Sequence, residues 1–191
     1  MLEVPALKDC LVSKVDYRYP RLMIFGSTSD HQTDLVMKLH NQNKVVREFE
    51  DDFEQFADLV IPIRSWPGRA RGTFTWLVEA SPEARRLLID KMKGKAYMDW
   101  RSVRIVDYVG ATRCFKCQNY GHRGSYCPKD KGTCGHCAEE GHSFGKCPSL
   151  QGPARCAPCK SKNRKFDHSV KSRTCPCFIE AAKREINRTD Y

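Results

Sequence analysis

The sequence predicts an α+β fold in which a β-α-β-β-α-β unit is followed by a series of short cysteine-rich modules. Apolar strands and amphipathic helices alternate over residues 20–110, whereas ten of the eleven cysteines lie between Cys114 and Cys177. Charge changes at the same boundary: residues 1–112 carry 17 Lys and Arg against 16 Asp and Glu, and residues 113–191 carry 16 against 7, a net of +9. A basic segment beside a neutral one is typical of a chain whose basic part meets a polyanion.

The first predicted strand covers residues 22–26, an apolar run that ends in glycine. Asp30 is placed to cap a helix that runs to about Asn41. The acidic stretch 48–54 is expected to be a loop. A second strand is expected over residues 57–64, and Pro62 should restrict it to the edge of the sheet because proline cannot donate a ladder hydrogen bond.

The third strand is expected over residues 73–80. Ser81 then caps a helix with a proline in its first turn and Gly94 after its last, the usual asymmetry of helix ends. Residues 96–98 and 103–109 form a last strand or a hairpin around residues 99–102.

This order of elements resembles that of RNA-recognition-motif domains, which use the split βαβ arrangement and bind RNA on aromatic side chains of the open sheet face. In the third strand Phe74 and Trp76 share one side, and Thr73 and Thr75 share the other. One face must cover the helices, and the bulkier side is the better candidate. We therefore expect an open face without a stacking platform, and the analogy assigns no RNA binding to the sheet.

Two tandem segments follow with the spacing C-x2-C-x4-H-x4-C, each with glycine directly before the histidine, and a third segment has looser spacing. The glycines, Gly121 and Gly141, permit the tight reversal that returns an imidazole to the cysteine pair. The predicted ligand sets are Cys114, Cys117, His122 and Cys127; Cys134, Cys137, His142 and Cys147; and Cys156, Cys159, His168 and Cys175.

Three thiolates and one imidazole with no open position are typical of a structural zinc site. The chain start lacks the pattern of a secretory signal, so the cysteines are expected in a reducing compartment, where such spacing indicates metal binding rather than disulfides. We therefore predict three Zn²⁺ per chain, with Cys177 as the alternative last ligand of the third site. His136 is expected at the surface, and Cys10, His31 and His40 have no partners at metal spacing and are expected to be ordinary packing or surface residues.

The first two segments resemble the CCHC zinc knuckles of retroviral nucleocapsid proteins in spacing, in the glycine before histidine and in the aromatic Phe115 after the first cysteine. In that family an apolar pocket accepts an unpaired base, which implies stacking on Phe115. The second knuckle has Gly135 at the corresponding position, although Phe144 can wall its pocket. The residues expected to contact single-stranded nucleic acid are Arg113, Phe115, Lys116, Arg123, Tyr126, Lys129, Lys131, Phe144 and Lys146.

The whole pattern resembles the gag-like first-reading-frame proteins of arthropod non-LTR retrotransposons of the jockey type and their relatives in ribosomal DNA. The resemblance covers about residues 20–180 and rests on residues 19–26, the helix start at Ser81, the junction 106–122 and the loose third knuckle. It implies binding of single-stranded RNA, and of single-stranded DNA as an open alternative. It also implies self-association in a ribonucleoprotein particle, nucleic-acid chaperone activity and the element's reverse transcriptase as a partner.

The expected division is a linker or remnant of an upstream domain over 1–19, an α/β domain over 20–110, knuckles over 113–128, 133–148 and 155–178, and a tail over 179–191. Relatives have more chain upstream, so a partial copy of a longer protein is expected.

No catalytic constellation is visible in the sequence. No run of residues has the length and apolarity of a membrane span, so no membrane partner is expected. The acidic run at Asp51, Asp52 and Glu54 is the pattern of a solvated face, no glycine-rich phosphate loop is present, and every zinc position is filled. We therefore expect a protein that is not an enzyme and that acts inside the cell as a cytoplasmic ribonucleoprotein, with nuclear entry left open. The alternative is a host zinc-knuckle protein that binds RNA or regulates translation.

Overall fold

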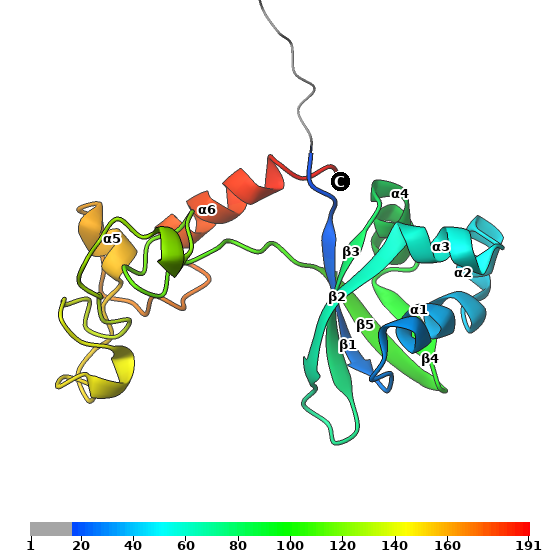
Figure 1. Cartoon of the computed structure of the whole chain (residues 1–191), viewed down its shortest axis with the longest axis horizontal. Coiled ribbons are helices and arrows are strands. Elements are labelled where there is room, and N and C mark those ends of the chain that lie inside the picture. Colours follow the sequence, from blue (N-terminus) through cyan, green and yellow to red (C-terminus); the bar gives the residue numbers. More distant parts are fainter. Residues whose placement is uncertain (1–16) are drawn as a thin grey trace, which may run out of the picture.

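The computed structural model describes residues 17–191, which form a sheet module (residues 17–107) and a knuckle module (residues 113–191), and the last helix of the knuckle module lies between the two (Figure 1). Most of the predicted linker 1–19, together with Cys10, lies outside the described residues. No helix of the described part is long and apolar enough to cross a membrane.

The sheet module is built on five antiparallel strands in the order β2-β3-β1-β5-β4. The strands are β1 (Arg21–Ser27), β2 (Val60–Pro67), β3 (Phe74–Ala80), β4 (Lys95–Met98) and β5 (Arg101–Asp107). The predicted mixture of helices and strands is thus confirmed, and the last predicted element is a hairpin. β2 lies at the edge, as Pro62 predicted.

Among residues 17–191, the helices of the sheet module pack on one face of this sheet (Figure 1). They are α1 (Gln32–Asn41), α2 (Lys44–Phe49), α3 (Phe53–Leu59) and α4 (Pro82–Arg85), the last continued by the π-helical turn η1 (Arg86–Lys91). Between helices and sheet lies one apolar core. Its largest fully buried members include Trp76, Phe56, Leu35, Leu88 and Met98.

The structure contains both signals that were expected to bound the helix after β3, the Ser81 cap at its start and the glycine after its end. The Ser81 hydroxyl accepts a hydrogen bond of 3.1 Å from the Ala84 amide, and Gly94 has φ +66°. A side chain at Gly94 would meet the Ile105 carbonyl at 2.5 Å, so the position also needs the close approach that only glycine allows.

Three expected elements were misplaced. The helix after β1 begins beyond His31, whose side chain makes no capping bond, and Asp30 stays outside it as an exposed residue. The stretch expected as an acidic loop contains the end of α2 and the start of α3, because the Asp52 carboxylate caps α3 through the amides of Glu54 and Gln55. The second strand therefore starts at residue 60 rather than 57.

The face of the sheet turned away from the helices is more aromatic than expected. Phe74, Trp76 and Val78 do face the core, as predicted. However, register places Phe25 and Trp66 beside Thr75 on the other face. The prediction of a face without aromatics was wrong because it considered β3 alone and neglected neighbouring strands.

A two-residue turn, Asp99-Trp100, joins β4 to β5 with positive φ at both positions. The Asp99 carboxylate accepts hydrogen bonds from Lys38 at 2.6 Å, Gln42 at 3.2 Å and Thr28. The bonds from Lys38, Thr28 and Gln42 lower the pKa of Asp99 to about 2. This carboxylate fixes the hairpin against α1.

The knuckle module contains four short helical elements: η2 (Gly124–Tyr126), η3 (Phe144–Lys146), α5 (Ala157–Ser161) and α6 (Pro176–Ile186). Residues 179–191 were expected to be a tail, but most of them form α6, which runs back to the sheet module (Figure 1). There the Arg18 amide donates to the Arg188 carbonyl at 2.9 Å and the Asp190 amide donates to the Arg18 carbonyl at 3.0 Å. The two modules are therefore connected by a second segment besides the chain leaving β5.

Candidate metal centres and nucleic-acid interface

The structure brings each of the three predicted ligand sets together. In every set the three sulfurs and one imidazole nitrogen lie within 4.8 Å of one another, although the members span up to twenty residues of sequence. The sets are Cys114, Cys117, His122 and Cys127; Cys134, Cys137, His142 and Cys147; and Cys156, Cys159, His168 and Cys175.

The first two clusters have the same backbone frame. The amides of Cys114 and Cys134 each donate at 2.8 Å to the carbonyl five residues later, which closes a tight loop behind the cysteine pair. Gly121 and Gly141 have φ +104° and +94°, so the expected reversal before each histidine occurs in the left-handed region. Each imidazole then lies 3.3 Å from the second cysteine sulfur.

Backbone amides also shape the acidity of the thiols. Burial raises the pKa of the Cys114 thiol, but hydrogen bonds from the amides of Cys117 and Lys116, together with those from the Cys117 and Cys127 thiols, outweigh it and bring the pKa below its ordinary value. At Cys117 burial prevails over the hydrogen bond from the Asn119 amide and raises the pKa of the thiol to about 11. Cys134 is favoured in the same way by the amides of Cys137 and His136. One thiol of each pair therefore has a lowered pKa, and metal binding requires the ligand thiols to be deprotonated.

The third cluster includes a small apolar core. Cys175 lies 3.6 Å from Cys156 and 3.5 Å from Cys159, sulfur to sulfur. Cys177, the alternative last ligand, lies 3.5 Å from Cys159 but outside the four-residue cluster. Burial raises the pKa of Cys156 to about 12 and that of Cys177 to about 11. Val170, Tyr120, Phe166 and Phe178 pack around these sulfurs.

The donor sets fit zinc. Bonds of about 2.3 Å from Zn²⁺ to sulfur place the corners of a tetrahedron about 3.7 Å apart. The Cys156–Cys175 and Cys159–His168 separations of 3.6 Å are close to that value. Four ligands fill a tetrahedron and leave no position for substrate, so each cluster can hold one structural Zn²⁺.

Neighbouring knuckles contact one another directly through hydrogen bonds. The Thr133 amide donates to the Lys116 carbonyl at 2.7 Å, and the Gln118 side chain donates to the Thr133 carbonyl at 3.2 Å, which joins the first knuckle to the second. Arg155 donates its amide to the His136 carbonyl at 2.6 Å, which joins the second to the third. Gln118 had no role assigned from the sequence, because its positive φ and its buried amide side chain become meaningful only once the knuckles touch.

Phe115 is 79% exposed and lies at a groove between the first two knuckles. The groove has a volume of about 370 Å³ and is also lined by Lys116, Lys131 and Gly132. The ring lies over Gly124, where an added Cβ would come within 2.4 Å of it. The first knuckle thus presents an uncovered aromatic face beside two cations.

Phe144 of the second knuckle is less accessible. His136 packs edge-on against its ring at 5.9 Å between centroids, and the Lys171 ammonium lies 5.5 Å from the ring centre. His136 also pairs with the Gly152 carbonyl at 3.1 Å and stands outside the cysteine cluster, as expected. His31 is exposed and His40 is buried beside Phe56, so both agree with the expectation of ordinary residues.

The basic residues expected at the interface divide into two groups. Arg113 donates to the Val170 carbonyl at 3.0 Å and Lys129 pairs with Glu140 at 2.5 Å, so both have structural partners. The remaining cations, Lys116, Arg123, Lys131 and Lys146, have no ion-pair partner among residues 17–191. Tyr126 is 80% exposed and faces the sheet module rather than the second knuckle.

Comparison with known proteins gives one informative match. The chain is similar to the 50 kDa protein in the type I retrotransposable element R1DM of Drosophila melanogaster, with 24% identity over 160 residues. That alignment covers 83% of this chain but 32% of the relative, so the chain spans about a third of the relative's length. No protein-family model and no solved structure matches the chain. The resemblance expected from the sequence is confirmed to this extent: the chain is related to a protein of an R1-type retrotransposable element, and its three Cys₃His clusters fit zinc knuckles.

Proposed function

We propose that the knuckle module binds single-stranded RNA of the element, with zinc holding the fold and Phe115 stacking on an unpaired base. The observation that carries this proposal is the exposed Phe115 ring beside Lys116 and Lys131 in the groove between docked knuckles. Aromatic faces combined with cations, without a helix that could enter a duplex groove, suit a single strand.

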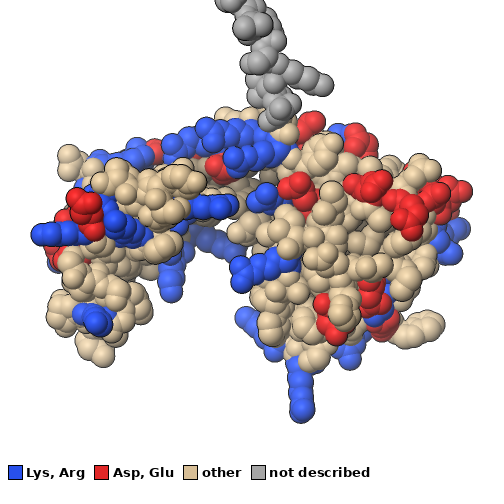
Figure 2. All heavy atoms as spheres, in the orientation of Figure 1, with Lys and Arg blue, Asp and Glu red and all other residues tan. Residues whose placement is uncertain are grey.

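Electrostatics support the same reading. Three thiolates and one Zn²⁺ leave each site at −1, so the net charge of +9 on residues 113–191 falls to about +6 when three ions bind. Basic side chains lie along α6 and beside the gap between the modules, whereas acidic ones gather on the far side of the sheet module (Figure 2). Binding should therefore weaken steeply with salt.

The relationship to a retrotransposable-element protein suggests the wider role. A basic protein that holds unpaired bases can assemble its transcript into a ribonucleoprotein particle and assist strand annealing during reverse transcription. We further propose that the chain self-associates in this particle and that the element's reverse transcriptase is a partner. The metal sites would be structural, and we expect no nuclease activity.

The first test is the affinity of zinc-loaded protein for a fluorescent single-stranded RNA. Phe115→Ala should weaken binding by about 1–3 kcal/mol, the usual value of one stacked base. Phe49→Ala provides a matched control because Phe49 is also exposed but lies on α2. Equal affinities of both variants and the parent protein would contradict the proposal.

A further inference from the structure

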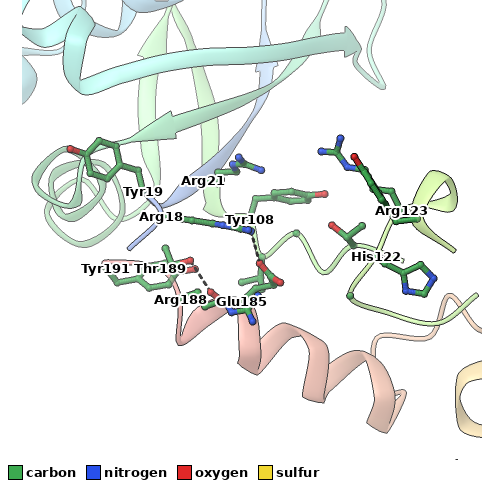
Figure 3. A pocket seen from close by; sticks show the side chains of 15 residues that line it. Arg18, Tyr19, Arg21, Tyr108, His122, Arg123, Glu185, Arg188, Thr189 and Tyr191 are labelled. Carbon is green, nitrogen blue, oxygen red and sulfur yellow. Dashed lines mark hydrogen bonds and ion pairs between the residues drawn. The ribbon is translucent and has the colours of Figure 1, made fainter. Parts of the chain in front are cut away.

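A cleft of about 720 Å³ lies where the sheet module, the first knuckle and the end of α6 meet. Figure 3 shows Arg21 and Tyr108 on the sheet side, Arg123 facing them from the first knuckle, and Arg188 on the α6 side. The lining residues come from four segments that are separate in the sequence: residues 18–21, 108–112, 121–126 and 185–191. Glu185, Arg188, Thr189 and Tyr191 line this cleft because the end of α6 returns to the sheet module.

The lining of this cleft is rich in arginine and tyrosine. It contains four arginines (Arg18, Arg21, Arg123 and Arg188), three exposed tyrosines (Tyr19, Tyr108 and Tyr126) and one acidic side chain, Glu185. Glu185 is paired with Arg18 at 3.1 Å, and Arg21 is paired with Glu79 at 3.2 Å.

Two of the four arginines remain available for a ligand. Arg123 and Arg188 are exposed and have no ion-pair partner in the described part of the chain. A cleft with two available guanidinium groups and uncovered phenol rings matches the phosphates and bases of a flexible nucleic acid.

The position of the cleft determines which nucleic acid it would meet. Arg123 and Tyr126 belong to the first knuckle, and Gly124 between them lies against the Phe115 ring of the groove. A strand leaving Phe115 along the knuckle surface therefore reaches the cleft without crossing an acidic patch among its lining residues. Because the two surfaces share one knuckle, one continuous strand can occupy both.

We propose that this cleft is a second binding surface for the same single strand, so that the bound RNA extends from the knuckles to the sheet module. The arginines contact phosphates, and Tyr108 offers a face to an unpaired base. The inference rests on the proposed RNA binding by the knuckles, and it adds that the sheet module and α6 lengthen the bound segment.

The test uses the full zinc-loaded chain and two RNA oligonucleotides, one just long enough for the knuckle groove and one several nucleotides longer. Tyr108→Leu should weaken binding of the long strand by at least about fivefold, the lower end for one stacked base, and leave the short strand unchanged. Arg188→Gln should flatten the salt dependence of the long strand by about one unit of slope. Arg47→Gln, an exposed arginine on α2, is the matched control.

Nuclease protection supplies a readout that a merely structural defect would not produce. The protected segment should shorten in Tyr108→Leu while its zinc content and melting temperature stay at the parent values. The inference would be overturned if the long strand kept its affinity and protected length, or if both strands weakened equally. Failure of the proposed function is distinguishable, because Phe115→Ala would then leave even the short strand unaffected.

Discussion

The sheet module and the knuckle module are held together by different physics. The sheet module buries a continuous apolar core between five strands and the helices on one face. The buried residues of the knuckle module are mainly cysteines, with Val170 and a few partly buried aromatics around the third cluster. Apolar burial stabilises a fold with or without metal, whereas a cysteine cluster contributes to folding only when a cation is bound.

Removal of the metal should produce the largest difference in stability between the two modules. Apparent zinc affinities in zinc-finger peptides are roughly 10–16 kcal/mol per site, so chelation should unfold residues 113–180 and leave residues 20–110 folded. All three tryptophans, Trp66, Trp76 and Trp100, lie in the sheet module. Circular dichroism should therefore report loss of structure while tryptophan fluorescence stays constant, and zinc should reverse the change. Loss of the whole fold in one step would refute the division into two modules.

The third cluster offers a sharper test within the knuckle module. Cys175 contacts both partner sulfurs, whereas Cys177 contacts Cys159 alone. Cys175→Ala should lower the zinc content from three to about two per chain, measured by elemental analysis after dialysis under reducing conditions. Cys177→Ala is the matched control and should keep three. The reverse outcome would make Cys177 the ligand.

A core substitution should affect the other module. Leu88 is fully buried, so Leu88→Ala should destabilise the sheet module by about 2–5 kcal/mol, measured by urea unfolding with tryptophan fluorescence. Zinc content should stay unchanged. Leu150→Ala, at a 43% exposed position, should do neither. Loss of zinc from Leu88→Ala would show that the knuckles depend on the sheet module for folding.

The smallest effect concerns Asp99. The folded pKa of about 2 lies below the ordinary value of 3.8, so the ionised carboxylate stabilises the sheet module above about pH 4 and this contribution is lost as pH falls toward 2. The side chain is 36% exposed, so solvent screening should keep the effect of Asp99→Asn below about 1 kcal/mol at pH 7. Asparagine tolerates the positive φ at this position.

This prediction is best measured in chelator, where we expect the knuckles to be unfolded at every pH. Urea midpoints of the parent protein and Asp99→Asn should converge between pH 4 and pH 2. Asp58→Asn, on an exposed face of α3, should track the parent. A constant difference between parent and Asp99→Asn across this range would contradict the assigned role.

The local parts of the molecule were predictable from the sequence. The ligands of each knuckle lie within one segment of at most twenty residues, and the left-handed Gly121 and Gly141 occur where the chain must reverse, so spacing alone identifies the clusters. The Ser81 cap and the inward face of β3 follow from equally local rules.

Features that depend on distant segments were missed. The aromatics Phe25 and Trp66 come to one face through strand register, which a scan of β3 cannot reveal. The return of α6 depends on pairing between Arg18 and Thr189, far apart in the chain. For the same reason the arginine-lined cleft had no sequence signal. Aspartate is a typical N-cap residue, so the Asp52 cap of α3 was predictable, but the neighbouring acidic residues favoured the prediction of a loop.

The most direct test of zinc-dependent RNA binding compares one protein in two metal states. Anisotropy titrations with single-stranded RNA at several salt concentrations should give tight, salt-sensitive binding by the zinc-loaded chain. Chelation should abolish most of that binding, and added zinc should restore it. Unchanged affinity after chelation, with the loss of zinc verified, would contradict the account by showing that the knuckles do not bind the RNA.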